Sequence, residues 1–314
     1  MLDLKQIHYA RTLAAHRNFA RAAEALGLSQ PALSRSIAGL EAALGVQLFN
    51  RTRQGVDPTG FGERFLARGG ALLTDAAELE RELQLMQGLE IGVLRVGAGP
   101  YPADMCVAPA IGRLIAGHPR VRAELRTSDW RAIVAQVLGA QLDLAVVELS
   151  EMERDPRLLT EPLPTHRAVF VCRVGHPLLD AKALAIERLF EFPLVSPKLP
   201  PRVGEVFLRL AKAWAIDPAT GDYVPPVKVD TLALAQAVVA SSDAIAIAPL
   251  CLVASDVQAG RLAMLPFREP WLHTNYGIVY LKDRALSPAS QAFVTEVRTV
   301  EAGLVEMEQR IDAA

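Results

Sequence analysis

The segment from Asn18 to Pro31 constrains the fold more than any other stretch, because it carries the start and stop signals of two helices. Asn18 is placed to cap a helix that begins at the next residue, and Gly27 has the conformational freedom that ends it. Ser29 can cap a further helix, whose first turn tolerates Pro31 because the amide that proline lacks has no partner there. The sequence therefore predicts two helices joined by a tight turn.

The second of these helices has two contrasting faces. Apolar side chains at helical spacing predict a buried stripe of Leu33, Ile37, Leu40 and Leu44. The opposite face carries small or polar residues, namely Gln30, Pro31, Ser34, Arg35 and Ala38. Such a shallow face can enter the major groove of DNA, where Arg35 can bind guanine or phosphate, Gln30 can bind adenine and Ser34 can bind several bases. An ordinary solvent-exposed helix surface is the alternative.

The flanking segments complete a winged helix-turn-helix pattern. Residues 4–15 show the apolar spacing of a preceding helix, in agreement with a helix-turn-helix arrangement. After the third helix, residues 46–60 can form a hairpin with Gly55 at its bend and with Arg51 and Arg53 near its tip. These arginines would lie against the phosphate backbone of a bound duplex.

The stretch FARAAEALGLSQPALSRSIAGLEAALGVQLFNRTRQG carries a specific resemblance. Residues 4–62 resemble the winged helix-turn-helix of the LysR-type transcriptional regulators, and the matching residues are Ala22, Ala23, residues 29–35, Leu40, Glu41, Leu44, Gly45, Leu48, Phe49 and Arg51. Asn18 replaces the usual serine and retains the capping function, and Pro58 stands at a position that is usually leucine. The resemblance implies a double-stranded DNA partner that is contacted by Ser29, Gln30, Pro31, Ser34, Arg35, Arg51 and Arg53.

The charge distribution favours a polyanion partner for the N-terminal part alone. Residues 1–68 hold nine lysine or arginine residues against five acidic residues, a net charge of +4, whereas the remainder has a net charge of −6. A basic head on an acidic body is typical of a protein in which only the head binds nucleic acid.

A long helix is predicted after the wing. Apolar residues recur at steps of three, four and seven and form a seam suited to a second chain, consisting of Phe61, Phe65, Leu72, Ala76, Leu79, Leu83 and Met86. A single helix packed on its own domain is the alternative, and the Gly69–Gly70 pair weakens the middle of the segment. The resemblance favours the seam, because it implies homodimers joined through this helix and often paired again into homotetramers.

Beyond residue 90 short apolar segments alternate with helical ones, which predicts an α/β fold. The expected strands are IGVLRVGAG, VRAELRTS, LDLAVVEL, RAVFVCRV, FPLVSP, PVKVDT, AIAIAP and NYGIVYL, several of them apolar enough for burial on both faces. The expected helices span residues 107–117, 130–139, 203–214, 231–241 and 287–309.

The resemblance extends over this part and implies an effector domain similar to the two-lobed type 2 periplasmic binding proteins, with crossings near residues 162 and 267. The expected fold class is α/β overall, with an N-terminal winged helix-turn-helix that is all-α except for a small β wing. The expected domains are this DNA-binding domain at residues 1–60, a linker and dimerisation helix at 61–90 and an effector-binding domain at 91–314. Lobe I would comprise residues 91–162 and 268–314, and lobe II residues 163–267.

Candidate effector contacts follow from the strand ends, because ligands of open α/β sheets bind beyond the carboxyl ends of strands and often at helix N-termini. These positions are Gly99, Pro100, Tyr101, Ser128, Glu148, Ser196, Pro197, Thr231 and Ala248. Ser128, Ser196 and Thr231 each precede or open a predicted helix, so an ordinary N-cap is the alternative for each. Tyr101 is placed either to stack on a ligand ring or to pack at a hinge.

Glu148 sets a condition on the small-molecule effector. A carboxylate in the cleft repels a bare anion unless Arg202 or another cation offsets it, or unless the ligand brings hydroxyl or amino donors. An exposed loop charge is the alternative, because Glu151 and Glu153 follow closely. A carboxylate or an aromatic metabolite is the expected kind of effector, and RNA polymerase is a further candidate partner.

Catalysis is not expected. The patterns G-x-x-x-x-G-K-S/T, H-E-x-x-H and G-x-S-x-G do not occur, and GAGPYP departs from the dinucleotide pattern at Pro102. The histidines are scattered and Cys106, Cys172 and Cys251 lack metal-ligand spacing, so neither a cofactor nor a metal is expected. Inert buried thiols are favoured over a redox switch.

Two other classes of protein compete with a ligand-responsive regulator. A solute receptor agrees with the α/β part but not with the N-terminal segment, and an architectural DNA protein leaves the α/β part unexplained. No long apolar run and no apolar leader occur, so neither membrane association nor export is expected, and a cytoplasmic location follows.

Overall fold

The computed structural model describes residues 3–52, 55–86, 93–152, 155–181, 184–209, 216–217 and 220–313. It divides into two compact units, Met1–Leu89 and Glu90–Ala314, and each has its own core.

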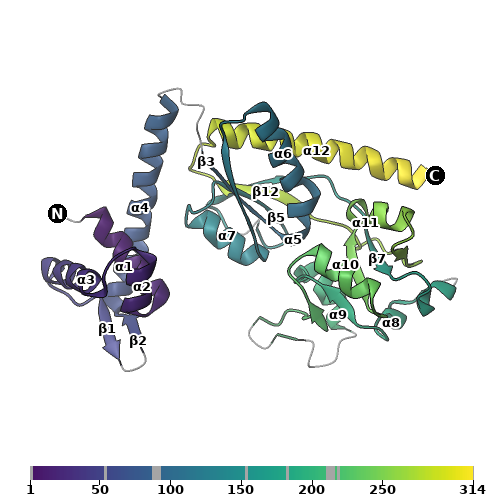
Figure 1. Ribbon diagram of the computed structural model, residues 1–314, viewed down its shortest axis with the longest axis horizontal. Coiled ribbons are helices and arrows are strands. Elements are labelled where there is room, and N and C mark those ends of the chain that lie inside the picture. The colour runs from purple at the N-terminus through teal and green to yellow at the C-terminus, as the bar shows by residue number, and fades with distance from the viewer. Residues whose placement is uncertain are drawn as a thin grey trace. The chain divides into compact units, whose positions relative to one another are not determined.

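The N-terminal unit combines short helices, a hairpin and one long helix (Figure 1). In chain order these are α1 (Leu4–His16), α2 (Phe19–Ala25), α3 (Gln30–Leu44), β1 (Phe49–Thr52), β2 (Gly55–Pro58) and α4 (Gly60–Met86). The side chains of Asp3, Asn18 and Ser29 cap α1, α2 and α3 by accepting hydrogen bonds from first-turn amides. Gly27 adopts a φ of +64°, which allows the tight turn between α2 and α3.

The apolar stripe of α3 lies in the core of this unit. Leu33, Ile37 and Leu40 are buried, and Leu44 is half-buried at the end of the helix. They pack with residues from α1, α2 and the hairpin segment, namely Ala10, Leu13, Phe19, Ala22, Ala23, Leu48, Phe49 and Val56. Burial of this stripe fixes which face of α3 remains outside.

Polar contacts attach the antiparallel β1–β2 hairpin to the helices. Glu41 Oε1 on α3 accepts hydrogen bonds from the amides of Leu48 and Phe49, at 2.7 and 3.0 Å. Arg17, directly after α1, forms an ion pair with Asp57 on β2. The hairpin is therefore oriented by α1 and α3 together.

The long helix α4 packs on α1 in its first half and leaves apolar side chains exposed along its length. A Cβ added at Gly69 would lie 2.6 Å from Ile7 Cγ2, so this glycine permits close approach of the two helices. Phe61, Leu72 and Leu79 are 64%, 46% and 56% exposed. The helix thus both packs on its own unit and presents an unburied apolar surface.

The C-terminal unit contains two five-stranded sheets, each covered by helices (Figure 1). The first sheet and its helices are called lobe I here. The strand order is β4-β3-β5-β12-β6, with β3 (Val93–Ala98), β4 (Arg122–Thr127), β5 (Leu144–Glu148), β6 (Leu158–Pro162) and β12 (Tyr276–Leu281). Strand β3 is parallel to β4 and β5, and β12 is antiparallel to β5 and β6. The helices are α5 (Pro100–Pro102), the π-helix η1 (Ala103–Val107), α6 (Ala108–Gly117), α7 (Trp130–Leu138) and α12 (Pro288–Ala313).

The second sheet and its helices are called lobe II. The strand order is β11-β7-β10-β8-β9, with β7 (Ala168–Cys172), β8 (Leu194–Ser196), β9 (Val227–Lys228), β10 (Ile245–Pro249) and β11 (Ala263–Met264). Strand β10 is parallel to β8 and antiparallel to β7. The helices are η3 (Pro177–Asp180), α8 (Ile186–Leu189), α9 (Pro201–Leu208), α10 (Leu232–Ala240) and α11 (Leu250–Gln258).

Two antiparallel segments join the lobes. Residues 163–168 lead from β6 to β7, residues 272–276 lead into β12, and the Thr274 amide donates to the His166 carbonyl at 2.8 Å. The return crossing lies a few residues beyond the expected position near 267, because Phe267 still packs in the core of lobe II. These paired crossings, called the hinge crossings here, are the segments that connect the two lobes.

Candidate functional site

The outward face of α3 is accessible within the N-terminal unit. Gln30, Pro31, Arg35 and Ala38 are exposed, and Ser34 is half-buried. The stripe on the opposite side of the helix supplies its packing, so the outward face is not needed to hold the unit together. A shallow face with one arginine, one glutamine and one serine has the donors and acceptors required for contacts in a major groove.

Two other predicted DNA contacts, Ser29 and Arg51, lie at the start of α3 and on β1. Ser29 Oγ accepts a hydrogen bond from the Ala32 amide at 3.4 Å, which orients the first turn of the helix. In helix-turn-helix domains this turn of the recognition helix contacts base edges. The backbone of Arg51 belongs to β1, and Arg53 lies outside the described residues.

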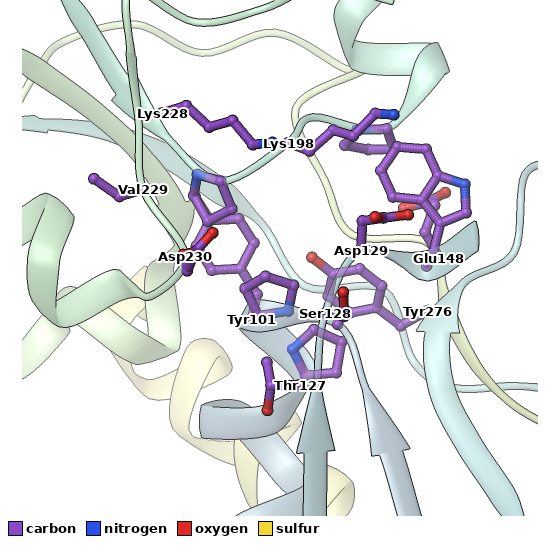
Figure 2. A pocket seen from close by; sticks show the side chains of 16 residues that line it. Tyr101, Thr127, Ser128, Asp129, Glu148, Lys198, Lys228, Val229, Asp230 and Tyr276 are labelled. Carbon is purple, nitrogen blue, oxygen red and sulfur yellow. The ribbon is translucent and has the colours of Figure 1, made fainter. Parts of the chain in front are cut away.

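A cleft of about 340 Å³ is lined by residues from both lobes (Figure 2). Six of the predicted effector contacts line it, namely Gly99, Pro100, Tyr101, Ser128, Glu148 and Pro197. They stand at the ends of β3, β4, β5 and β8, where the sequence placed them. The volume falls within the range of about 300–1,000 Å³ that is usual for small-molecule sites.

The other four predicted effector contacts lie elsewhere. Ser196 is fully buried on β8, and Ala248 packs in the core of lobe II. Thr231 caps α10, since its hydroxyl oxygen accepts from the Leu234 amide at 3.3 Å. Arg202 lies behind the cleft lining, where its Nε is 3.3 Å from Glu148 Oε1.

Asp129, which follows Ser128 at the end of β4 and was a strand-end candidate beside it, also lines the cleft, and residues that the sequence did not single out complete the lining: Pro102, Thr127, Trp130, Lys198, Pro200, Lys228, Val229, Asp230 and Tyr276. Several of them neighbour a predicted position, so extending each strand end by two residues would have included Thr127, Trp130 and Lys198. Lys198 and Lys228 lie at one edge of the cleft in Figure 2, and Thr127 lies at the opposite edge. The cap of α7 is Asp129 and not Ser128.

Glu148 is buried, which excludes the alternative of an exposed loop charge. Its side chain is 4% exposed, and its Oε1 accepts from Ser150 Oγ at 2.6 Å and from Arg202 Nε at 3.3 Å. Arg202 also donates to the carbonyl of Trp271 at 3.0 Å and to that of His273. Arg202, the cation expected to offset this carboxylate, therefore stands directly beside it.

An ion-pair network spans the two lobes beside the cleft. Arg131 on α7 donates to Asp222 at 2.5 Å and to Glu151 at 2.8 Å, and Lys198 Nζ lies 2.9 Å from Asp222. Burial alone would raise the pKa of Asp222, but hydrogen bonds from Arg131 and Lys198 outweigh it and hold that pKa well below its usual range. Trp130 packs under the network, with the Arg131 guanidinium 5.0 Å from its ring centroid.

Two tyrosines form part of the cleft surface. Tyr101 comes from lobe I, packs among core residues of lobe II and donates its hydroxyl to the Ile247 carbonyl. Burial raises the pKa values of Tyr101 and Tyr276 well above the usual range, so both are neutral hydroxyl groups. Tyr101 therefore packs between the lobes and also lines the cleft.

Burial disfavours the thiolate form of all three cysteines. Burial raises the pKa of Cys172 to about 11 and that of Cys251 to about 12, and it also raises the pKa of the buried Cys106 thiol. In the part of the chain that the structure describes, no group of three or more His, Cys, Asp or Glu side chains is arranged to hold a metal ion. The described helices include none long and apolar enough to span a bilayer.

An exposed helix-turn-helix face and a two-lobed unit with a lined cleft together define a DNA-binding regulator with an effector-binding domain. Residues 4–63 match the family described as "Bacterial regulatory helix-turn-helix protein, lysR family", and residues 87–302 match the "LysR substrate binding domain". The chain belongs to the LysR family of bacterial transcriptional regulators, which are not enzymes.

Relatives and solved structures of the family resemble the chain over most of its length. It is 38% identical to the "SDS degradation transcriptional activation protein" of a Pseudomonas species, over 93% of this chain and 94% of the relative. It is 28% identical to the regulator GbpR of Azospirillum brasilense, over 95% and 86% of the two chains. The fold is similar to that of the LysR family regulator CbnR, with a TM-score of 0.61, 18% identity, and coverage of 96% and 99% of the two chains.

Proposed function

We propose that this regulator recognises a specific duplex sequence with the outward face of α3 and that a small molecule in the interlobe cleft controls its effect on transcription. The exposed polar face opposite the buried stripe of α3 is the observation that carries the proposal. The proposed DNA contacts are Ser29, Gln30, Pro31, Ser34, Arg35, Arg51 and Arg53. The proposed effector contacts are Gly99, Pro100, Tyr101, Ser128, Glu148 and Pro197, with Arg202 acting through Glu148.

Through the ion pairs across the cleft, a bound effector can change how the two lobes are arranged. Asp222 of lobe II binds Arg131 of lobe I, so a ligand that displaces or strengthens this contact changes the relative stability of the lobe arrangements. A ligand shifts such an equilibrium only by its differential affinity for the two arrangements, typically about 1–3 kcal/mol. The domain division at residues 1–60, 61–90 and 91–314 is part of this proposal.

The regulated process is inferred from the relatives. A relative at 38% identity is named as a transcriptional activator of SDS degradation, which supports a role in switching on the breakdown of a small organic compound. We include RNA polymerase as the partner through which bound regulator changes transcription. Because the genes and the polymerase are in the cytoplasm, the protein is proposed to act there.

We further propose that α4 joins two copies of the chain. Phe61, Leu72 and Leu79 are members of the predicted seam and are substantially exposed, whereas Phe65 packs on the core of its own unit. A helix with unburied leucines at this spacing is suited to pair with a second helix. A homodimer is the minimal assembly, and a homotetramer would need a second interface.

Leu72→Arg is expected to weaken the dimer at least about tenfold, because each buried leucine contributes about 1.5–3 kcal/mol and about 1.4 kcal/mol is tenfold. Sedimentation equilibrium of the full chain measures the change. Ala71→Arg is the matched control, since the neighbouring Ala71 is exposed and lies outside the seam. Equal dissociation constants for the two variants would argue against this use of α4.

Selection of random duplexes on the purified full chain tests the proposed function. We expect enrichment of one sequence with two related half-sites, bound at least about a thousandfold more tightly than unrelated DNA at physiological salt. Binding that does not discriminate between duplexes, or no binding at all, would contradict the proposal.

A further inference from the structure

One carboxylate oxygen of Glu148, in the cleft lining, has no hydrogen-bond partner in the part of the chain that the structure describes. Ser150 and Arg202 both donate to Oε1, whereas Oε2 is buried and has no hydrogen-bond partner among the described residues. A buried acceptor without a hydrogen-bond donor is energetically unfavourable, because it has lost its hydrogen bonds to water. Because Glu148 lines the cleft, a bound molecule can supply the missing donor.

The charges that line the cleft do not favour a bare anion. Among the described residues the lining holds three carboxylates, Asp129, Glu148 and Asp230, and two ammonium groups, Lys198 and Lys228, and the Arg202 guanidinium stands beside Glu148. Lys198 is already bound to the carboxylate of Asp222, at 2.9 Å. Lys228 is exposed and therefore screened by solvent.

The N-terminus of α7, beside the cleft, already has a carboxylate as its hydrogen-bond partner. The first amides of α7 would attract an anionic ligand group, but Asp129 Oδ1 accepts from the amides of Arg131 and Ala132, at 3.0 and 3.2 Å. The protein's own carboxylate thus fills the position in which a ligand oxyanion would gain most from this helix.

We propose that the effector donates a hydrogen bond from a hydroxyl or amino group to Glu148 Oε2, so that the cleft selects neutral alcohols, amines or zwitterions over bare monoanions. This inference rests on the proposed function only in calling the cleft ligand an effector. Ligand selection by the cleft can be measured without DNA. Glu148 acts as a specificity-determining residue, and the contact with the Arg202 guanidinium holds its side chain in place.

Ligand-observed NMR titration of the full chain with benzyl alcohol, benzylamine and benzoate tests the proposal. The three probes share one ring and differ in the polar group that meets the lining. We expect the alcohol and the amine to bind at least about tenfold more tightly than benzoate, as for a hydrogen bond to a charged group. Glu148→Gln should reduce the advantage of the amine over benzoate at least about tenfold.

Glu205→Gln is the matched control, because Glu205 is exposed on α9 and does not line the cleft, and it should leave the order unchanged. The order of probe affinities is measured on the wild-type chain, so this part of the test does not depend on the folding of any variant. Benzoate binding as tightly as the other probes, no binding of the alcohol and the amine, or an unchanged order in Glu148→Gln would each overturn the inference. A chain that selects a duplex but prefers benzoate contradicts this inference alone, and one that shows the expected order but selects no duplex contradicts only the proposed function.

Discussion

Replacing His166 by alanine is expected to lower the free energy of unfolding of the C-terminal unit by about 3–5 kcal/mol, the usual cost of removing one partner of a buried ion pair. His166 lies in the first crossing segment and its side chain is fully buried. Its Nε2 is 2.7 Å from Glu301 Oε2, and its Nδ1 is 3.4 Å from Glu308 Oε2. Without the imidazole, two largely buried carboxylates on α12 would lose their cation.

The same contact predicts how stability depends on pH. Burial by itself would lower the pKa of His166, but hydrogen bonds and charges from Glu301 and Glu308 outweigh it and raise the pKa to about 9. In the unfolded chain the pKa of histidine is about 6.5. The stabilisation is therefore complete below about pH 6.5 and is lost as the pH rises through about 9.

Urea unfolding of the full chain between pH 6 and pH 10 measures both effects, followed on the transition of the C-terminal unit. The wild-type chain should lose more stability across this window than His166→Ala, because other groups titrate equally in both. His118→Ala is the matched control, since His118 is an exposed histidine of the same unit. A loss below about 1 kcal/mol, or the same pH dependence in His166→Ala and the wild type, would show that His166 is not the cation of this cluster.

The His166 cluster matters for function because of where α12 runs. This helix packs against α6 of lobe I and against α11 of lobe II, and its Ile311 packs on the core of lobe II. Its two carboxylates therefore hold the hinge crossing from a helix that touches both lobes. The change in lobe arrangement that we propose for effector binding therefore has to preserve this ion pair or break it.

The N-terminal unit could be predicted from the sequence because its determinants are local. Asn18 and Ser29 cap helices whose amides lie two or three residues further along, and Gly27 turns the chain between them. The burial of Leu33 and Ile37 follows from helical periodicity alone. The role of Gly69 could not be predicted, because its contact with Ile7 joins helices that are distant in sequence.

The strands that the sequence missed lack the usual signals. Strand β6 has the sequence LLTEP, in which a glutamate and a proline interrupt the apolar pattern, and β11 is only two residues long. Helix α11 follows β10 without a break, and Pro249 at its N-cap makes no side-chain hydrogen bond. Pairing with neighbouring strands defines β6 and β11, and packing in lobe II defines α11. Local propensity does not define these elements.

The cleft could be located from strand ends but its chemistry could not be completed. Tyr276 and Lys228 enter the lining from segments whose position depends on how the two lobes face each other. The nearby acidic residues favoured an exposed Glu148, whereas its burial depends on Arg202, which lies 54 residues further along the chain. Ser196 and Ala248 are near the correct strand ends but pack into lobe II, because side chains alternate between the faces of a strand.

Arg35→Ala is expected to weaken binding to the selected duplex by about 1–3 kcal/mol and to relax the preference at one base position. Arg35 is exposed on the outward face of α3, one helical turn beyond Pro31. An arginine at this place can form two hydrogen bonds with guanine, and alanine removes both without disturbing the buried stripe. Fluorescence anisotropy with the selected duplex and with single-base variants measures the affinity and the preference.

The salt dependence separates two roles for Arg35. A base contact predicts a loss that is confined to the selected sequence, whereas a phosphate contact predicts equal weakening on all duplexes and a salt slope smaller by about one. Arg268→Ala is the control, because it also removes one exposed arginine but lies in the other unit. If Arg35→Ala and Arg268→Ala bound the selected duplex equally well, the outward face of α3 would not be the surface that recognises DNA.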